Sequence, residues 1–281
     1  MTEVTPGIYR IKLPLPRVEG IPAYVNIYLV RSDGGYLLVD TGLDNIDTFT
    51  SLKSHMSAIG ADIGEISQIV VSHIHPDHYG QSGSLKRLAG ARFLLHDVEK
   101  DLIDSRYIHP EKLLEQTGLW LHKNGVPDEE LTAIQTASLS LLDTVTATYP
   151  DITLHGEEIV TAGEFNFKVL WTPGHSAGHI CLYEPRRKVL LAGDFILADI
   201  TPNVSLHPQS GENPLGEYID ALNRIRQLEI ELVLPGHGEP FTGIQARIED
   251  LIHHHELRSA EIFQALHEEP RNAYQVAGKI T

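Results

Sequence analysis

Residues 70–83 read VVSHIHPDHYGQSG and are the most informative stretch of this sequence. The stretch begins apolar and then places His73, His75, Asp77 and His78 within six positions. A strand end that only closes a hydrophobic core does not need so many imidazoles and carboxylates. The stretch therefore indicates one of three things: a metal site, acid–base chemistry without a metal, or a polar loop without a catalytic role.

The spacing of these residues favours a metal site. His73 and His75 are two apart after a strand, so in extended backbone their side chains share one side. Pro76 keeps His75 extended, and Asp77 and His78 enter the following turn. The loop thus offers ligands in two groups, directed toward two nearby points. Histidine nitrogen and carboxylate oxygen suit zinc, iron or manganese.

Three further candidate ligands follow apolar strands and stand beside glycine. They are His175 in TPGHSAGH, Asp194 in LLAGDF and His237 in LPGHGEP. Glycine at a strand end lets backbone approach closely and bends the strand end outward. A single histidine at a strand end is usually structural, but three such elements together with HIHPDH predict a site for two metal ions.

Composition and charge narrow the class of protein. The chain has 281 residues, 42% of them hydrophobic, which allows one large domain or a domain with an appendage. A net charge of −16 disfavours broad nucleic-acid binding. A chain with this net charge can still carry a local basic patch. The single cysteine, Cys181, excludes an internal disulfide and fits a reducing compartment.

The sequence supports neither export nor membrane insertion. The N-terminal residues show no signal-peptide pattern, and no apolar stretch reaches the roughly 18 residues of a spanning helix. We therefore expect a cytoplasmic protein that acts on a small-molecule substrate and has no membrane anchor. No motif indicates an oligomeric state.

Alternating and continuous apolar runs predict the secondary structure. SDGG at 32–35 predicts a hairpin turn, and strand signals vanish at about 98–150, which predicts a helical insertion. Helices are expected at 48–59, 80–89, 213–228 and 244–267, with a further small helix after Pro270. Strands are expected at 8–13, 25–30, 36–40, 68–72, 92–96, 164–172, 179–184, 188–194 and 231–236.

The motifs HIHPDH, TPGHSAGH, GDF and LPGHGEP occur in this order, preceded by VDTG at 39–42. The ordered combination resembles the metallo-β-lactamase-fold hydrolase superfamily over about residues 5–245. The resemblance implies an α+β fold, namely a four-layer αββα sandwich with a metal site at one edge of its two sheets. It implies that one metal is held by His73, His75 and His175. It also implies that a second metal is held by Asp77, His78 and His237, with Asp194 bridging the two.

Sequence segments from residue 193 onward make the resemblance more specific. GDFILADITPNV, NPLGEYIDALNRI and RIEDLIHHHELR resemble lactamase-beta-2-like and glyoxalase II-like proteins, which carry a C-terminal helical or winged-helix tail. We therefore expect a metallo-β-lactamase-like domain at 1–243, containing the insertion, and a C-terminal helix with a partial winged-helix-like tail at 244–281. Two divalent ions are expected, with zinc first and iron or manganese as alternatives.

A mechanism follows from such a site. Two cations about 3.5–4 Å apart can share one water and lower its pKa from 15.7 to about 7. The metal-bridged hydroxide would then attack a carbonyl or phosphoryl centre, with Asp77 as the catalytic residue that orients it. Asp40 and His179 are expected to support the ligands from behind. The simpler alternatives are a turn-capping aspartate and a structural histidine.

Several functions are compatible with this site. The first is hydrolysis of a small ester, thioester, lactone or amide. Nuclease or phosphodiesterase chemistry is the alternative, and mononuclear iron persulfide oxygenation is third because such relatives commonly lose part of the second ligand set. A metal-stabilised binding module is the non-enzymatic reading. Tyr79, Tyr107 and Tyr218 are candidate oxyanion donors, and the sequence selects none of them.

Overall fold

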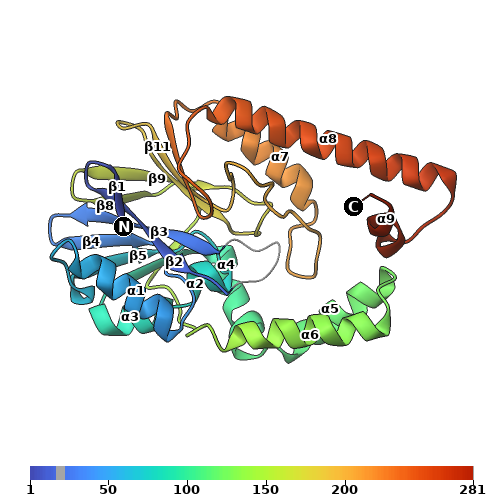
Figure 1. The fold of residues 1–281 in the computed structure, drawn as a ribbon, viewed down its shortest axis with the longest axis horizontal. Helices are drawn as coiled ribbons and strands as arrows, with labels where there is room; N and C mark the ends of the chain where they lie inside the picture. Colours follow the sequence, from blue (N-terminus) through green and yellow to red (C-terminus); the bar gives the residue numbers. More distant parts are fainter. Residues whose placement is uncertain (17–22, 281) are drawn as a thin grey trace.

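Two facing sheets lie between two layers of helices in the computed structural model, which describes residues 1–16 and 23–280 (Figure 1). The first sheet has seven strands in the order β1-β2-β3-β4-β5-β6-β7. The second has five strands in the order β12-β11-β10-β9-β8. The predicted α+β fold, a four-layer αββα sandwich, is confirmed.

The first sheet is antiparallel from β1 to β4 and parallel from β4 to β7. Ser32 pairs with Gly35 across the β3–β4 turn, so the SDGG hairpin prediction is confirmed. The strands are β1 (Thr2–Thr5), β2 (Ile8–Pro14), β3 (Tyr24–Ser32), β4 (Gly35–Val39), β5 (Ile66–Val70), β6 (Arg92–His96) and β7 (Ile152–Leu154).

In the second sheet, β11 and β12 are parallel and the other neighbouring strands are antiparallel. Its strands are β8 (Ile159–Ala162), β9 (Phe165–Trp171), β10 (Ile180–Glu184), β11 (Val189–Gly193) and β12 (Leu232–Pro235). Strands β1, β7 and β8 are missing from the sequence-based expectation. All three are short and end a sheet, so they bury few side chains and show little apolar patterning.

Three apolar layers hold the sandwich together. The central layer lies between the sheets and includes Val30, Phe167 and Leu191. An outer layer joins the first sheet to α1 (Ile46–Ser57) and α3 (Ser82–Ala89). The other outer layer joins the second sheet to α7 (Pro214–Ile225) and α8 (Ile244–Glu268). Strands covered on both faces read as continuous apolar runs, which is why most of them are visible in the sequence.

A helical segment connects β6 to β7, where the insertion was predicted. It consists of α4 (Asp97–Ile103), the π-helical turn η2 (Asp104–Ile108), α5 (Glu111–Lys123) and α6 (Asp128–Leu142). Helices α5 and α6 form a hairpin that projects from the sandwich (Figure 1). Two short elements, η1 (Ile63–Glu65) and α2 (Pro76–Tyr79), flank β5.

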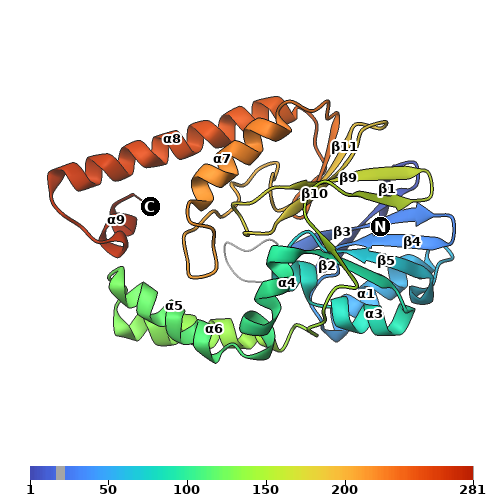
Figure 2. The ribbon, with the colours of Figure 1, turned by 180° about the vertical axis from the view of Figure 1, so that it is seen from behind.

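The C-terminal helices form a second projection. The start of α8 packs on the second sheet through Ile244, Ile248 and Leu251, and the rest of the helix runs beyond the sandwich (Figure 2). The final helix, α9 (Ala273–Ile280), returns to the tip of the α5–α6 hairpin. There the Tyr274 amide donates to the Asn124 carbonyl at 3.1 Å, and its hydroxyl donates to Glu130 at 2.6 Å. The domain division at residue 243 stays a prediction.

No helix within residues 1–16 and 23–280 has both the length and the apolar character needed to cross a bilayer.

Candidate metal centre

The candidate ligands gather where strands of both sheets end. His73 and His75 follow β5, and Asp77 and His78 lie in α2 immediately after them. His175 lies in the loop between β9 and β10, and Asp194 and His237 follow β11 and β12. Because β4 and β5 are parallel, as are β11 and β12, their carboxyl ends meet at one edge of each sheet.

Backbone contacts hold these two edges against each other. The Ile180 amide donates to the Ser72 carbonyl at 2.9 Å, and the Asn26 amide donates to the Gly236 carbonyl at 2.6 Å. Gly236 also explains the glycine of LPGHGEP. A Cβ at this position would lie 2.4 Å from Asp194 Oδ1 and 2.8 Å from His78 Cε1, so only glycine fits beside these side chains.

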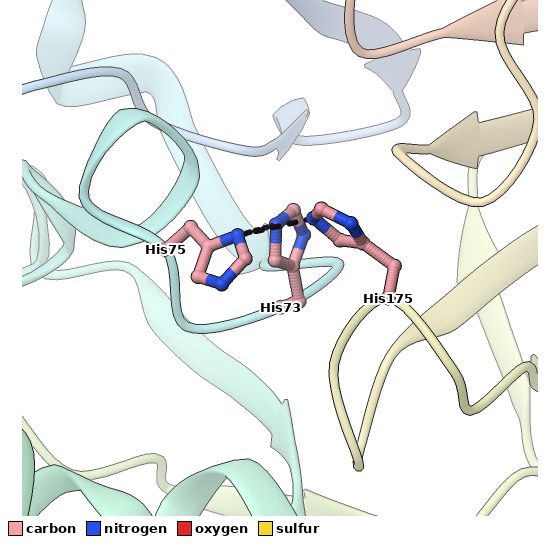
Figure 3. A group of neighbouring side chains, drawn as sticks. All are labelled: His73, His75 and His175. Atoms are coloured by element: carbon pink, nitrogen blue, oxygen red, sulfur yellow. Dashed lines mark hydrogen bonds between the residues drawn. The ribbon is translucent and has the colours of Figure 1, made fainter. Parts of the chain in front are cut away.

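Three histidines form the first group of candidate ligands. His73 Nε2 lies 2.9 Å from His75 Nδ1, and His175 Nε2 lies 3.1 Å from the same nitrogen. Figure 3 shows the three imidazoles turned toward one another, two from the loop after β5 and one from the loop after β9. Their nitrogens are close enough to bind one cation.

Asp77, His78 and His237 form the second group. Asp77 Oδ2 lies 3.2 Å from His237 Nε2 and 3.8 Å from His78 Nε2. Asp194 lies between the two groups. Its Oδ2 is 3.4 Å from both His78 Nε2 and His237 Nε2, and 3.7 Å from His175 Nε2. One carboxylate therefore faces both groups.

The other ring nitrogen of four of these histidines is held by a neighbouring oxygen. His78 Nδ1 donates to Asp40 Oδ2 at 2.8 Å. The remaining partners are Ser72 Oγ for His73, the Asn203 carbonyl for His175 and the Tyr24 carbonyl for His237. Each Nδ1 thereby donates to its oxygen partner, which leaves each Nε2 as the nitrogen directed into the cluster.

Burial and the neighbouring carboxylates shift the pKa values of the candidate ligand histidines in opposite directions. Burial lowers the pKa of His73 and of His75 well below the ordinary value, so both are neutral, as metal ligands must be. Burial also opposes the charged form of His78 and His237. The carboxylates around these two outweigh that effect, holding the pKa of His78 well above its usual range and raising that of His237 to about 10.

The donor set fits divalent cations. His78 Nε2 and Asp194 Oδ1 are buried and have no hydrogen-bond partner within the described part of the chain. A buried polar atom without a partner is costly, by about 1–3 kcal/mol or more. A cation between the groups would satisfy both atoms and would balance the carboxylates of Asp77 and Asp194. Nitrogen and oxygen donors without a thiolate suit zinc, iron or manganese.

Comparison with known proteins identifies the family. The family model for the metallo-beta-lactamase superfamily matches residues 20–237. The chain belongs to the metallo-beta-lactamase superfamily. The resemblance drawn from the sequence motifs is therefore confirmed, and with it membership in a superfamily of metal-binding hydrolases.

Relatives of similar length support this assignment. A metallo-beta-lactamase family protein from Thermus thermophilus superposes with a TM-score of 0.87 at 30% identity, covering 99% of this chain and 88% of its own. The probable metallo-hydrolase YqjP of Bacillus subtilis is 28% identical, over 98% of this chain and 85% of its own. The acyl-coenzyme A thioesterase MBLAC2 of Bos taurus is 26% identical, over 77% of this chain and 74% of its own.

Asp40 and His179, which were expected to support the ligands, both lie beside the cluster. Asp40 contacts His78 as described above. His179 is buried, and its Nε2 accepts a hydrogen bond from the Asp194 amide at 3.2 Å. Its Nδ1 lies 2.9 Å from Thr172 Oγ1. His179 thus contacts the backbone of Asp194 and stands outside the two ligand groups.

None of the three candidate tyrosines has a hydroxyl hydrogen directed at the cluster. Tyr79 donates to the Thr148 carbonyl at 2.6 Å and Tyr218 donates to the Phe195 carbonyl at 2.9 Å. Tyr107 donates to the Ile74 carbonyl. All three hydroxyls bind backbone oxygens, so these tyrosines hold loops in place.

Glu99, in α4, is a site residue that the sequence did not reveal. Its buried carboxylate accepts hydrogen bonds from the Ile74 amide at 2.9 Å, the Gly178 amide at 2.6 Å and the Ser176 hydroxyl at 2.5 Å. Ile74 lies between His73 and His75, whereas Ser176 and Gly178 follow His175. Glu99 therefore joins the two loops that carry the first group of ligands.

Proposed function

We propose that this protein is a metal-dependent hydrolase that cleaves a small ester, thioester, lactone or amide. The observation that carries the proposal is the position of Asp194. Its Oδ2 lies within 3.7 Å of histidine nitrogens from both ligand groups. A carboxylate that faces both ligand groups can be shared by a pair of neighbouring divalent cations.

The proposed ligands follow from the same geometry. His73, His75 and His175 would hold one divalent ion, and Asp77, His78 and His237 would hold the other, with Asp194 shared. Zinc is proposed first, with iron or manganese as alternatives, because all seven donors are nitrogen or oxygen. When bound, such ions supply a water of lowered pKa and a positive field at the oxygen that gains charge.

Asp77 is the proposed catalytic residue. Its side chain is 25% exposed, whereas that of Asp194 is 10% exposed, so Asp77 lies on the solvent side of the cluster. A carboxylate in this position can accept a hydrogen bond from the attacking water and orient it toward the substrate carbonyl. Asp40 and His179 act on the ligands: Asp40 fixes the tautomer of His78, and His179 holds the amide of Asp194.

The comparisons support hydrolysis and favour an acyl substrate. The Bacillus subtilis relative is named a probable metallo-hydrolase, and the Bos taurus relative is named an acyl-coenzyme A thioesterase. The net charge of −16 disfavours a nucleic-acid substrate, so phosphodiester cleavage is the second candidate.

The proposal is tested by metal analysis combined with a substrate screen. Protein purified without chelator is analysed for metal content and then assayed against ester, thioester, lactone and RNA or model phosphodiester substrates at two salt concentrations. We expect close to two zinc or manganese ions per chain, and turnover of a carboxylic acid derivative that a chelator abolishes. Close to one iron per chain with oxygen consumption on glutathione persulfide, or turnover of phosphodiesters alone, would contradict the proposal.

A further inference from the structure

A cavity of about 250 Å³ lies between the α5–α6 hairpin and the metal centre. Its wall is mainly aliphatic and is built from both helices of the hairpin, through Leu113, Leu114, Leu121, Leu141 and Leu142. The side chains with polar groups in its lining are His75, Arg106, Tyr107 and Thr117. An apolar concave site with a few polar groups is the usual form of a small-molecule site.

The cavity adjoins the metal centre at His75, the one candidate ligand among its lining residues. The Nδ1 atom of this residue lies 2.9 Å from His73 Nε2 and 3.1 Å from His175 Nε2. Pro76, the next residue, also lines the cavity and begins the helix that carries Asp77. A molecule with its apolar end among the leucines can therefore extend its other end toward His75 and the first group of candidate ligands.

The described side chains of the hairpin leave this space unfilled. No described residue of α5 is fully buried, and Leu141 of α6 keeps 47% of its surface exposed. Apolar surface left in contact with water favours an apolar occupant, because removing such surface from water is favourable. The volume suits a narrow chain rather than a folded partner.

We propose that this cavity binds the linear aliphatic acyl chain of the substrate, placing the carbonyl carbon at the metal centre. The inference rests on the proposed function and adds the substrate class: acyl thioesters or oxygen esters with a saturated chain longer than acetyl. The leucines of α5 and α6 set chain-length preference, and the residues around Asp194 carry the chemistry.

The first experiment measures kcat/KM for thioesters of one thiol, N-acetylcysteamine, with saturated acyl chains from acetyl to decanoyl. We expect kcat/KM to rise by roughly threefold per added methylene until the cavity is filled, below the fourfold that complete burial would give. Oxygen esters and acylamino lactones carrying the same octanoyl chain then identify the preferred head group. A flat chain-length profile with every head group would overturn the inference.

Two tryptophan variants on α5 provide a matched test. Leu114→Trp places a large ring in the cavity, whereas Leu119→Trp adds the same ring at a position that is 64% exposed. We expect L114W to lower kcat/KM for the octanoyl thioester by about tenfold or more and to leave the acetyl thioester nearly unchanged. L119W should match the parent protein on both substrates. Circular dichroism and melting temperature show whether both variants fold, and Leu121→Trp replaces L114W if it does not.

A binding measurement separates the cavity from the chemistry. Calorimetry compares the non-hydrolysable thioethers S-octyl- and S-ethyl-N-acetylcysteamine on the purified protein. Tighter binding of the octyl compound that L114W removes and L119W retains supports the inference, even if no substrate is cleaved; in that case only the proposed function fails. Equal affinity for both thioethers overturns the inference, even if the protein proves to be a metal-dependent hydrolase.

Discussion

Asp40 and His78 form a buried hydrogen-bonded pair, with Asp40 Oδ2 2.8 Å from His78 Nδ1. Asp40 has a φ of 63°, a conformation in which aspartate and asparagine are far more common than most residues. Its Oδ1 accepts from the Ser72 amide at 2.7 Å, and its Oδ2 also accepts from the Ser72 hydroxyl at 3.0 Å. One carboxylate thus orients His78 directly and His73 through Ser72.

Replacing Asp40 with asparagine should weaken metal binding without unfolding the chain. Asparagine tolerates the same backbone conformation, but its amide has one acceptor fewer for the three donors around it. We expect affinity for at least one metal ion to fall by about 10–100-fold, as is typical when such a partner is lost. Competition with a chromophoric chelator measures the change. The exposed turn variant Asp33→Asn is the control. If D40N binds metal as tightly as D33N does, Asp40 does not support the ligands.

Asp194→Ala should abolish both turnover and full metal retention. The substitution removes the carboxylate that faces both ligand groups and leaves His78 and His237 without that anionic neighbour. Elemental analysis and the substrate screen are the measurements. Asp250→Ala, at an exposed position on α8, should retain both properties. Wild-type-like activity in D194A would refute the proposed mechanism.

Removal of metal should lower thermal stability. Ligands that bind only the folded chain stabilise it, by about 2.7 kcal/mol when their free concentration is a hundred times Kd. Chelator-treated protein should therefore melt at a lower temperature, and added zinc should restore the original value. Calorimetry with zinc and with magnesium distinguishes a specific effect from ionic strength. Identical melting curves with and without chelator would show that the cluster does not retain a cation.

Glu99→Gln should loosen the two loops that carry His73, His75 and His175. A glutamine has one acceptor oxygen for donors on both sides, so at least one buried N–H loses its partner. A lost hydrogen bond to a charged group corresponds to about 1.5–3 kcal/mol. Urea denaturation should register this loss, and metal affinity should fall with it. Asp101→Asn, an exposed change on the same helix, serves as the control; equal stability of the two variants would argue against the role of Glu99.

The pH dependence of stability has an identifiable contribution from Glu158. Burial raises the pKa of this carboxyl, but hydrogen bonds from the amides of residues 155–158 and from the His155 ring outweigh burial and lower it to about 2. A lowered folded-state pKa stabilises the fold above the unfolded value, near 4.5, and the contribution is lost as pH falls toward 2. Glu158→Gln should therefore reduce stability at pH 7 and flatten the wild-type decline between about pH 4.5 and 2. Thermal melts across this range test it, and parallel curves for the two proteins would be the contrary result.

The sequence predicts the sandwich and the candidate ligands because both follow from local patterns. Apolar runs mark most of the strands, and HIHPDH places four of the candidate ligands within six consecutive residues. Edge strands β1, β7 and β8 escape prediction because they bury little. Glu99 escapes for a different reason: an acid in the first turn of a helix looks like a favourable dipole contact, and its burial depends on loops distant in sequence. The cavity depends on how α5 and α6 pack, which periodicity does not specify.

The contact between α9 and the α5–α6 turn links two parts of the chain that are far apart in sequence, through Tyr274, Asn124 and Glu130. For protein engineering, this makes the hairpin and the C-terminal helix a matched pair. A chimera that takes α5 and α6 from a relative should take that relative's equivalent of α9 as well. For the same reason an affinity tag is better fused to the N-terminus, away from this junction.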